Sequence, residues 1–174
     1  MLLLIIAHFT TNFPIFQGGT HVIYLVTHGE RFEGADPLHT KLGHRQIAGI
    51  KVPKNATGIM RGTGKRHTEL ALVVSGKLPD ETPIFTSPLV GSADSFNKDG
   101  TVTLANGIIV RGKDYVGLMG TPGLNLWGVI AGFPDKTLIC GGVDVMLALG
   151  LGAINADAGL YKLDTAHRTA EKLN

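Results

Sequence analysis

The stretch HVIYLVTHGE, residues 21–30, decides the fold. It begins as a continuous run of β-branched and other apolar residues, which is typical of a strand buried on both faces of a parallel sheet. The run ends at Thr27, and His28 and Gly29 follow at once, so the strand should deliver an imidazole into a turn. Ligands of open α/β sheets bind beyond the carboxyl ends of the strands, which makes His28 the first candidate functional residue. An imidazole there can act as a nucleophile, a base or a phosphate-binding donor, or it can be a polar residue satisfied by nearby backbone groups.

Strand-like and helix-like segments alternate along the rest of the chain. This alternation predicts an α/β fold class, a three-layer α/β/α sandwich with a mostly parallel central sheet. An Asn-Gly pair between two apolar runs also predicts a β-hairpin. The predicted strands are 21–27, 57–62, 82–88, 136–141 and 159–164, the predicted helices are 38–50, 65–76, 124–133 and 143–152, and the hairpin covers 98–115.

Length and composition describe one globular domain. The chain has 174 residues, of which 44% are hydrophobic and 17% charged, and its formal charge of +2 is too small to indicate a nucleic-acid partner. Cys140 is the single cysteine and cannot form an intrachain disulfide, so a reducing compartment, the cytoplasm, is expected.

Residues 1–20 are expected to form an N-terminal extension, an arm or an edge strand, before a domain at 21–174. The apolar start MLLLIIA is interrupted by His8, Asn12 and Pro14. It is shorter than the roughly 20 residues of a membrane-spanning helix, so no membrane partner is expected. A weak signal peptide is the alternative interpretation of this segment.

Two further glycine turns follow predicted strands. The segment 61–67, RGTGKRH, places Arg61, Lys65, Arg66 and His67 around two glycines at a predicted helix start, where backbone N–H groups and the helix dipole favour an anion. It lacks the pattern of a Walker loop, and it can also be a solvated basic helix start. The third turn follows Cys140, which could be the nucleophile of a cysteine hydrolase or a small buried apolar residue.

The segment YLVTHGE…DPLHTKLGHRQIA resembles the opening of the histidine phosphatase superfamily, the phosphoglycerate mutase-like proteins. That signature is a strand, Arg-His-Gly-Glu, and then Pro-Leu-Thr-x-x-Gly-x-x-Gln-Ala at the first helix. One residue, His39, is inserted here before Thr40. The matching residues are Val26, His28, Gly29, Glu30, Pro37, Leu38, Leu42, Gly43 and Gln46.

The later blocks of the family match more loosely. IMRGTGKRHTELA is similar to the second block, Ser-x-x-x-Arg-Ala-x-Gln-Thr-Ala, with Gly62 for the serine and Arg66 at the arginine. A competing placement on IFTSPLVGSADSF would put Gly91 at the arginine. TLICGGVDVM is similar to the third block, a strand ending in Ser/Thr-His-Gly, with Gly141 in place of the histidine.

The resemblance implies a phosphate pocket with an incomplete catalytic quartet. His28 would take the phosphoryl group and Arg66 would clamp it, while Thr27 stands for the first arginine and Gly141 for the second histidine. The implied substrate-binding residues are Thr27, Gly29, Gly62, Lys65, Arg66 and Gly141. The carboxylate that protonates the leaving oxygen is open among Glu30, Glu81, Asp94 and Asp114.

Two functions follow from this pocket. One is a weak or inactive relative that binds a small phosphorylated or anionic ligand or a partner protein. The other is an active phosphomonoesterase in which Arg31, Arg61, Lys65 or His67 supplies the missing charge. The remaining histidines show no metal-ligand spacing, so neither a metal nor another cofactor is expected. The sequence does not predict an oligomeric state.

Overall fold

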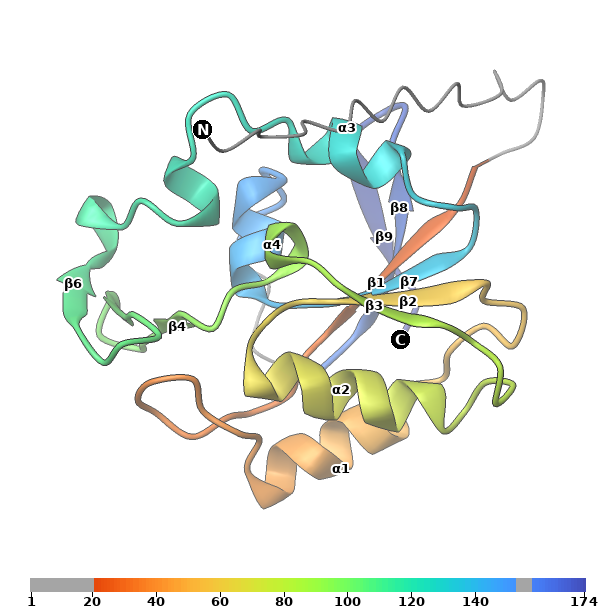
Figure 1. Ribbon diagram of the computed structural model, residues 1–174, viewed down its shortest axis with the longest axis horizontal. Helices are drawn as coiled ribbons and strands as arrows, with labels where there is room; N and C mark the ends of the chain where they lie inside the picture. The colour runs from red at the N-terminus through yellow and green to blue at the C-terminus, as the bar shows by residue number, and fades with distance from the viewer. Residues whose placement is uncertain (1–20, 153–157) are drawn as a thin grey trace, which may run out of the picture.

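A twisted six-stranded sheet forms the centre of the molecule (Figure 1). The computed structural model describes residues 21–152 and 158–174, so the predicted extension at 1–20 lies outside the described residues. The strand order is β3-β2-β7-β1-β8-β9. Strands β1, β2, β3 and β7 are parallel, whereas β8 and β9 are antiparallel to their neighbours. The strands are β1 (Ile23–Thr27), β2 (Gly58–Arg61), β3 (Ile84–Thr86), β7 (Thr137–Gly141), β8 (Leu160–Asp164) and β9 (Thr169–Lys172).

Helices cover both faces of this sheet, which confirms the predicted three-layer α/β/α class. Helices α1 (Lys41–Gly49) and α2 (Lys65–Ser75) lie on one face, and α3 (Leu126–Ala131) and α4 (Val143–Ala148) lie on the other (Figure 1). Side chains alternate along β1, because Leu25 packs with α3 and α4 whereas Val26 packs with α1 and α2. The strand that opens the domain is therefore buried on both faces, as its apolar run predicts.

Local capping sets the helix boundaries near the sheet. Thr40 caps α1 because its hydroxyl accepts a hydrogen bond from the Gly43 N–H. Lys77 lies just beyond α2 and donates to three carbonyls at the end of α1, those of Ile47, Ala48 and Ile50. This lysine satisfies orphan carbonyls of α1 and ties the two helices of one face together.

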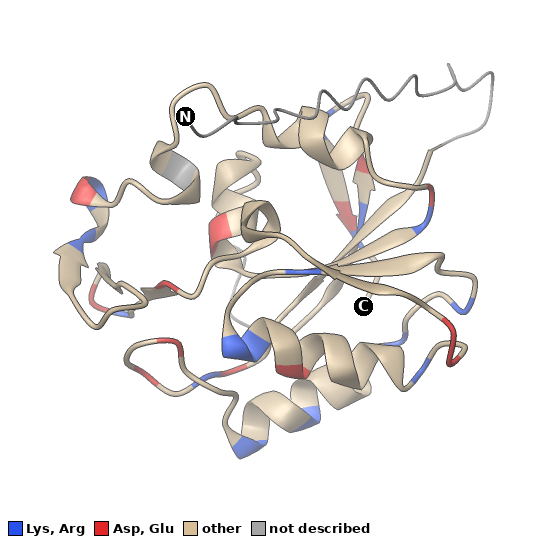
Figure 2. Ribbon diagram, in the orientation of Figure 1, with Lys and Arg blue, Asp and Glu red and all other residues tan. Residues whose placement is uncertain are grey.

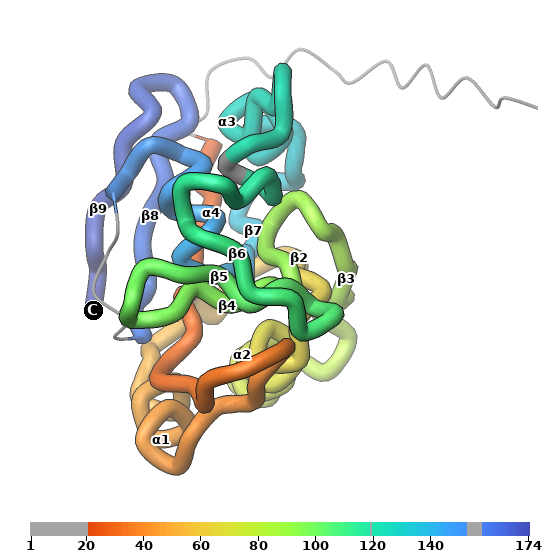
Figure 3. The backbone as a smooth tube through the Cα atoms, turned by 90° about the vertical axis from the view of Figure 1, so that its left-hand side faces the viewer, coloured from red at the N-terminus to blue at the C-terminus, as the bar shows by residue number. Residues whose placement is uncertain are grey.

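A small antiparallel sheet, β4-β5-β6, lies over the carboxyl ends of the parallel strands (Figure 3). Strands β5 (Thr101–Thr103) and β6 (Ile109–Arg111) form the hairpin that the Asn-Gly pair predicts. The strands β4 (Ser95–Phe96) and β9 were not predicted, because β4 has two residues and β9 is mostly polar, so neither has a period to detect. The short helical turns are η1 (Pro88–Val90), η2 (Gly112–Asp114) and η3 (Leu118–Gly120). Within 21–152 and 158–174 no helix is long and apolar enough to cross a membrane.

A pair of leucines on α2 provides a test of this layered packing. Leu70 is fully buried between α2 and the sheet, whereas Leu72 is 61% exposed. Leu70→Ala should lower the free energy of unfolding by about 2–5 kcal/mol, and Leu72→Ala should change it by less than about 0.5 kcal/mol. Urea denaturation of both variants measures the difference. Equal losses would contradict the assignment of this helix face to the core.

Candidate functional site

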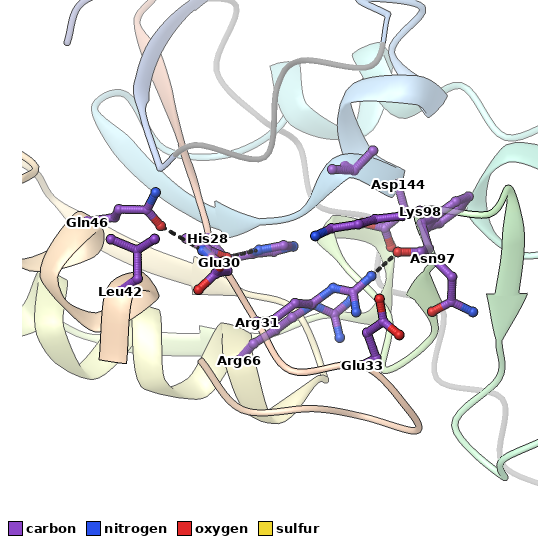
Figure 4. A pocket seen from close by; sticks show the side chains of 13 residues that line it. His28, Glu30, Arg31, Glu33, Leu42, Gln46, Arg66, Asn97, Lys98 and Asp144 are labelled. Carbon is purple, nitrogen blue, oxygen red and sulfur yellow. Dashed lines mark hydrogen bonds between the residues drawn. The ribbon is translucent and has the colours of Figure 1, made fainter. Parts of the chain in front are cut away.

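A cavity of about 320 Å³ opens at the carboxyl end of β1 (Figure 4). Its walls come from the turn after β1, the starts of α2 and α4, helix α1 and the small sheet. Figure 2 shows the basic start of α2 and the acidic start of α4 at this same end of the molecule. The lining residues are His28, Gly29, Glu30, Arg31, Glu33, Leu42, Gln46, Arg66, Phe96, Asn97, Lys98, Val143 and Asp144.

His28 projects from the end of β1 into this cavity and is 7% exposed. Its Nδ1 lies 2.9 Å from the Gly29 carbonyl, which can only accept, so Nδ1 carries the proton and Nε2 keeps a lone pair. Burial, and then the charge of Arg66, lowers the pKa of His28 to about 3. The imidazole is therefore neutral at neutral pH, as a nucleophile must be.

Two glycines hold the turn that carries His28 against α1. A Cβ on Gly29 would stand 2.7 Å from the Gly43 carbonyl oxygen, and a Cβ on Gly43 would stand 1.9 Å from the Glu30 carbonyl oxygen. No side chain fits at either position. Gln46 completes the contact, since its Oε1 accepts the Glu30 N–H at 2.8 Å.

Arg66 brings a buried positive charge to the same cavity. It is 2% exposed, and its Nη2 donates to the carbonyls of Ser92 at 3.1 Å and Asp94 at 2.7 Å. Its Nε and Nη1 have no hydrogen-bond partner among the described residues. A buried guanidinium with N–H groups left over is suited to bind an anion.

No family model matches the sequence, and no curated protein matches it. The fold resembles that of many solved structures, two of which are the following. The structure of TTHB049 from Thermus thermophilus has 14% sequence identity and a TM-score of 0.52, with 88% of this chain and 99% of that chain covered. The complex of mycobacterial glucosyl-3-phosphoglycerate phosphatase Rv2419c with inorganic phosphate has 12% identity and a TM-score of 0.51, with 82% and 89% covered.

The chain has the histidine phosphatase fold. Identity this low establishes a shared fold, and the activity has to be argued from the residues of the cavity. The sequence resemblance puts Thr27 in the place of an arginine. Its hydroxyl accepts the Gly159 N–H at 3.0 Å and lies 3.4 Å from the Gly159 carbonyl oxygen. Thr27 therefore binds the backbone of the residue that precedes β8.

The sequence resemblance puts Gly141 in the place of a histidine, but Gly141 and Gly142 face opposite sides at the end of β7. Gly141 faces the core, because a Cβ there would stand 2.8 Å from the Val90 carbonyl oxygen and 3.1 Å from a methyl group of Val145. Gly142 faces the site, because a Cβ there would stand 3.2 Å from His28 Cδ2. The site position at this strand end is therefore Gly142 rather than Gly141.

The other predicted pocket residues divide into two groups. Gly29 and Arg66 line the cavity with His28. Lys65 and Gly62 do not line it: Lys65 is exposed, and Gly62 packs against the ring of His67.

Two cations at the cavity come from segments outside the three glycine turns. Arg31 donates to the Phe96 carbonyl and, at 3.1 Å, to that of Phe32, and burial lowers its pKa to about 10. Lys98 follows β4 and extends across the cavity toward His28 (Figure 4). Sequence reasoning offered Arg31 as a replacement charge but did not find Lys98, since nothing local places the small sheet over the site.

Asp144 is the buried carboxylate of the site. It is 1% exposed and accepts hydrogen bonds from the Ser92 N–H at 2.9 Å and the Val145 N–H at 3.0 Å. Burial raises its pKa, against the lowering effect of these donors and of Arg66. Sequence reasoning missed it, although its place at a helix start after two glycines was a usable signal.

The four carboxylates that the sequence offered as proton donors are less suited to that role than Asp144. Glu30 lines the cavity, but its carboxylate accepts a hydrogen bond from the Thr40 hydroxyl. Asp94 accepts from the Tyr115 hydroxyl and Asp114 pairs with Arg111, both outside this cavity. Glu81 is exposed and also outside the cavity.

The inserted His39 packs beside His28, with the ring centroids 6.0 Å apart. Its Nδ1 and its backbone N–H both lie 2.8 Å from a carboxylate oxygen of Glu69. Along 21–152 and 158–174 no group of three or more His, Cys, Asp or Glu side chains is arranged to hold a metal ion.

Cys140 lies in the core between the sheet and the α1–α2 layer, fully buried. Burial raises the pKa of its thiol, which keeps it protonated and unreactive. The cysteine-hydrolase alternative therefore has no accessible thiolate.

Acid sensitivity of folding tests the buried state of His28. Its folded-state pKa of about 3 lies below the ordinary value of 6.5, so between these values the unfolded chain binds a proton that the folded protein does not. The free energy of unfolding should therefore fall as the pH drops below 6.5, with about 1.4 kcal/mol per pH unit from this residue. His28→Gln should make the slope shallower, whereas Leu72→Ala, which changes no ionisable group, should keep it. Urea denaturation between pH 7.5 and 5 measures the slope, and the same slope in His28→Gln would contradict the burial.

Alkylation tests the placement of Cys140. Iodoacetamide at pH 8 should leave the native protein unmodified by intact mass and should modify the urea-unfolded chain at one site. Rapid alkylation of the native protein would mean that the thiol is exposed.

Proposed function

We propose that the protein binds a small phosphorylated molecule in this cavity and transfers its phosphoryl group, slowly, to His28. One observation supports this most: His28, a neutral imidazole with a lone-pair nitrogen, and Arg66, a guanidinium with unpartnered N–H groups, both line the same cavity. A phosphate needs both a nucleophile in line and donors for its spread negative charge. The histidine phosphatase fold is consistent with this chemistry and leaves the substrate open.

The proposed reaction has two steps. In the first, His28 Nε2 attacks phosphorus, a P–N bond forms, the P–O bond to the leaving alcohol breaks, and protonated Asp144 gives its proton to the leaving oxygen. In the second, water attacks phosphorus, the P–N bond breaks, phosphate is released, and Asp144 takes a proton from the water. Burial raises the pKa of Asp144, which favours the protonated form that the first step requires.

Slow turnover follows from the donors that are absent at two positions. Thr27 offers no charge and directs its hydroxyl to the Gly159 backbone, and Gly142 has no side chain to offer. Loss of one preorganised donor typically lowers a rate by about 10²–10³. A protein of this kind can serve chiefly as a binder of a phosphorylated or anionic ligand.

An efficient phosphomonoesterase is the alternative, and the position of Arg31 favours it. This arginine lines the cavity beside Arg66 (Figure 4), where a second guanidinium could hold the phosphoryl oxygens. The two functions share the cavity and His28 and differ in rate.

Vanadate binding and phosphatase turnover test the proposal. Isothermal titration with orthovanadate should show binding that weakens about 10–100-fold in Arg66→Met, because a charge-assisted donor is lost. Arg45→Met, the same change on an exposed site of α1, should bind as wild type does. Slow hydrolysis of p-nitrophenyl phosphate should disappear in His28→Ala.

Three other results of these measurements would change the proposal. Equal vanadate affinity in Arg66→Met and Arg45→Met would remove Arg66 from the site. Turnover that survives in His28→Ala would exclude a phosphohistidine on this residue, and fast turnover that disappears in His28→Ala would favour the efficient enzyme.

A further inference from the structure

His67 is a second imidazole close to His28; it does not line the cavity itself, and its ring nitrogens have no hydrogen-bond partner among the described residues. It lies in the first turn of α2, next in sequence to Arg66, and is fully buried. Neither Nδ1 nor Nε2 has a hydrogen-bond partner in the part of the chain that the structure describes. Buried polar atoms in folded proteins are almost always hydrogen-bonded, so this ring calls for a partner that the described chain does not supply.

Three glycines from three segments make room for this ring. A Cβ on Gly62 would stand 2.4 Å from His67 Nδ1, and one on Gly91 would stand 2.6 Å from His67 Cε1. A Cβ on Gly142 would stand 3.1 Å from His67 Nε2. Side chains at Gly62 or Gly91 would therefore displace the imidazole. The ring fits in this slot, the space between Gly62, Gly91 and Gly142, because these residues have no side chains.

The slot orients His67 toward His28. The two ring centroids are 5.8 Å apart. The point where a Gly142 Cβ would stand is 3.1 Å from His67 Nε2 and 3.2 Å from His28 Cδ2, the carbon bonded to His28 Nε2. The Nε2 edges of both rings thus meet beside Gly142, and the Asp144 carboxylate borders the same point, with its Oδ1 at 2.9 Å.

We propose that His67 is a phosphoryl-binding residue, whose Nε2–H donates to an oxygen of the group held at His28. This inference rests on the proposed function and assigns a residue within that site. It explains why Nε2 of this buried ring is unpaired, since the bound oxyanion is its missing partner. It also shows how a site with a glycine at the end of β7 can contain two imidazoles: the second one comes from α2.

A purely structural role makes the opposite prediction for stability. A histidine that fills space and makes hydrogen bonds loses stability when an apolar side chain replaces it. Removal of unsatisfied buried nitrogens has little effect on stability or increases it, while removal of a ligand donor weakens binding. An apolar replacement of His67 should therefore lower stability if the role is structural. If His67 binds the ligand, the replacement should lower affinity and leave stability unchanged or higher.

The test compares His67→Leu and His67→Gln with wild type and with His167→Leu, an exposed histidine between β8 and β9. Urea midpoints should be at least as high as wild type for His67→Leu. Orthovanadate affinity should fall about tenfold in His67→Leu, less in His67→Gln, which keeps an N–H donor, and not at all in His167→Leu. Unchanged affinity in His67→Leu, with Arg66→Met still weakened, would overturn the role of His67 and leave the proposed function intact. Absence of vanadate binding in wild type would overturn both.

A measurement on wild type keeps the test independent of whether the variants fold. Long-range ¹H–¹⁵N spectra of the histidine rings, recorded through an orthovanadate titration, should show the His67 Nε2 signal shift together with that of His28. A shift at His28 with no change at His67 would overturn the inference.

Discussion

The close contact between the turn after β1 and the start of α1 is the constraint on which the site depends. Gly29 and Gly43 approach so closely that a Cβ on either would collide with the other segment's backbone. With the turn held there, the Gly29 carbonyl lies in place to accept the His28 Nδ1–H, and Nε2 is left for the cavity. One backbone contact thus sets both the direction and the tautomer of the candidate nucleophile.

Around this contact the protein buries a cation, Arg66, and a carboxyl group, Asp144, whose pKa burial raises. Arg66 is held by the backbone carbonyls of Ser92 and Asp94, and Asp144 by N–H groups of Ser92 and Val145. The segment at 92–94 therefore positions the cation and the carboxylate together. Neutral His28 and His67 stand beside Arg66 and Asp144, since burial and Arg66 lower the pKa of each ring. A dianionic phosphoryl group would meet donors already in place, which limits the reorganisation that binding requires.

The site was predictable where its residues belong to short local patterns. His28, Gly29 and Arg66 follow strands and glycine turns, so their place at the carboxyl ends of parallel strands could be inferred. Asp144 follows the same kind of strand and glycine turn and was missed, whereas Lys98 could not be found in this way, because the cavity reaches it only after the small sheet folds over the main one. The sequence offered His67 as a replacement charge, but its burial depends on Gly62, Gly91 and Gly142, from segments 29 and 51 residues apart along the chain, which no local pattern reveals.

The sequence by itself determined most of the strands and helices along the chain, the hairpin and the three-layer class, because the periods of apolar residues are local properties. Tertiary structure alone decided which side chains face the cavity. Successive residues at the end of a strand point to opposite sides, so one position separates Gly141 in the core from Gly142 at the site. The same holds for Thr27 and His28, of which the first bonds to Gly159 and the second enters the cavity. A shift of one residue is too small to be read from a pattern of apolar residues, and only the packing of the chain against itself settles it.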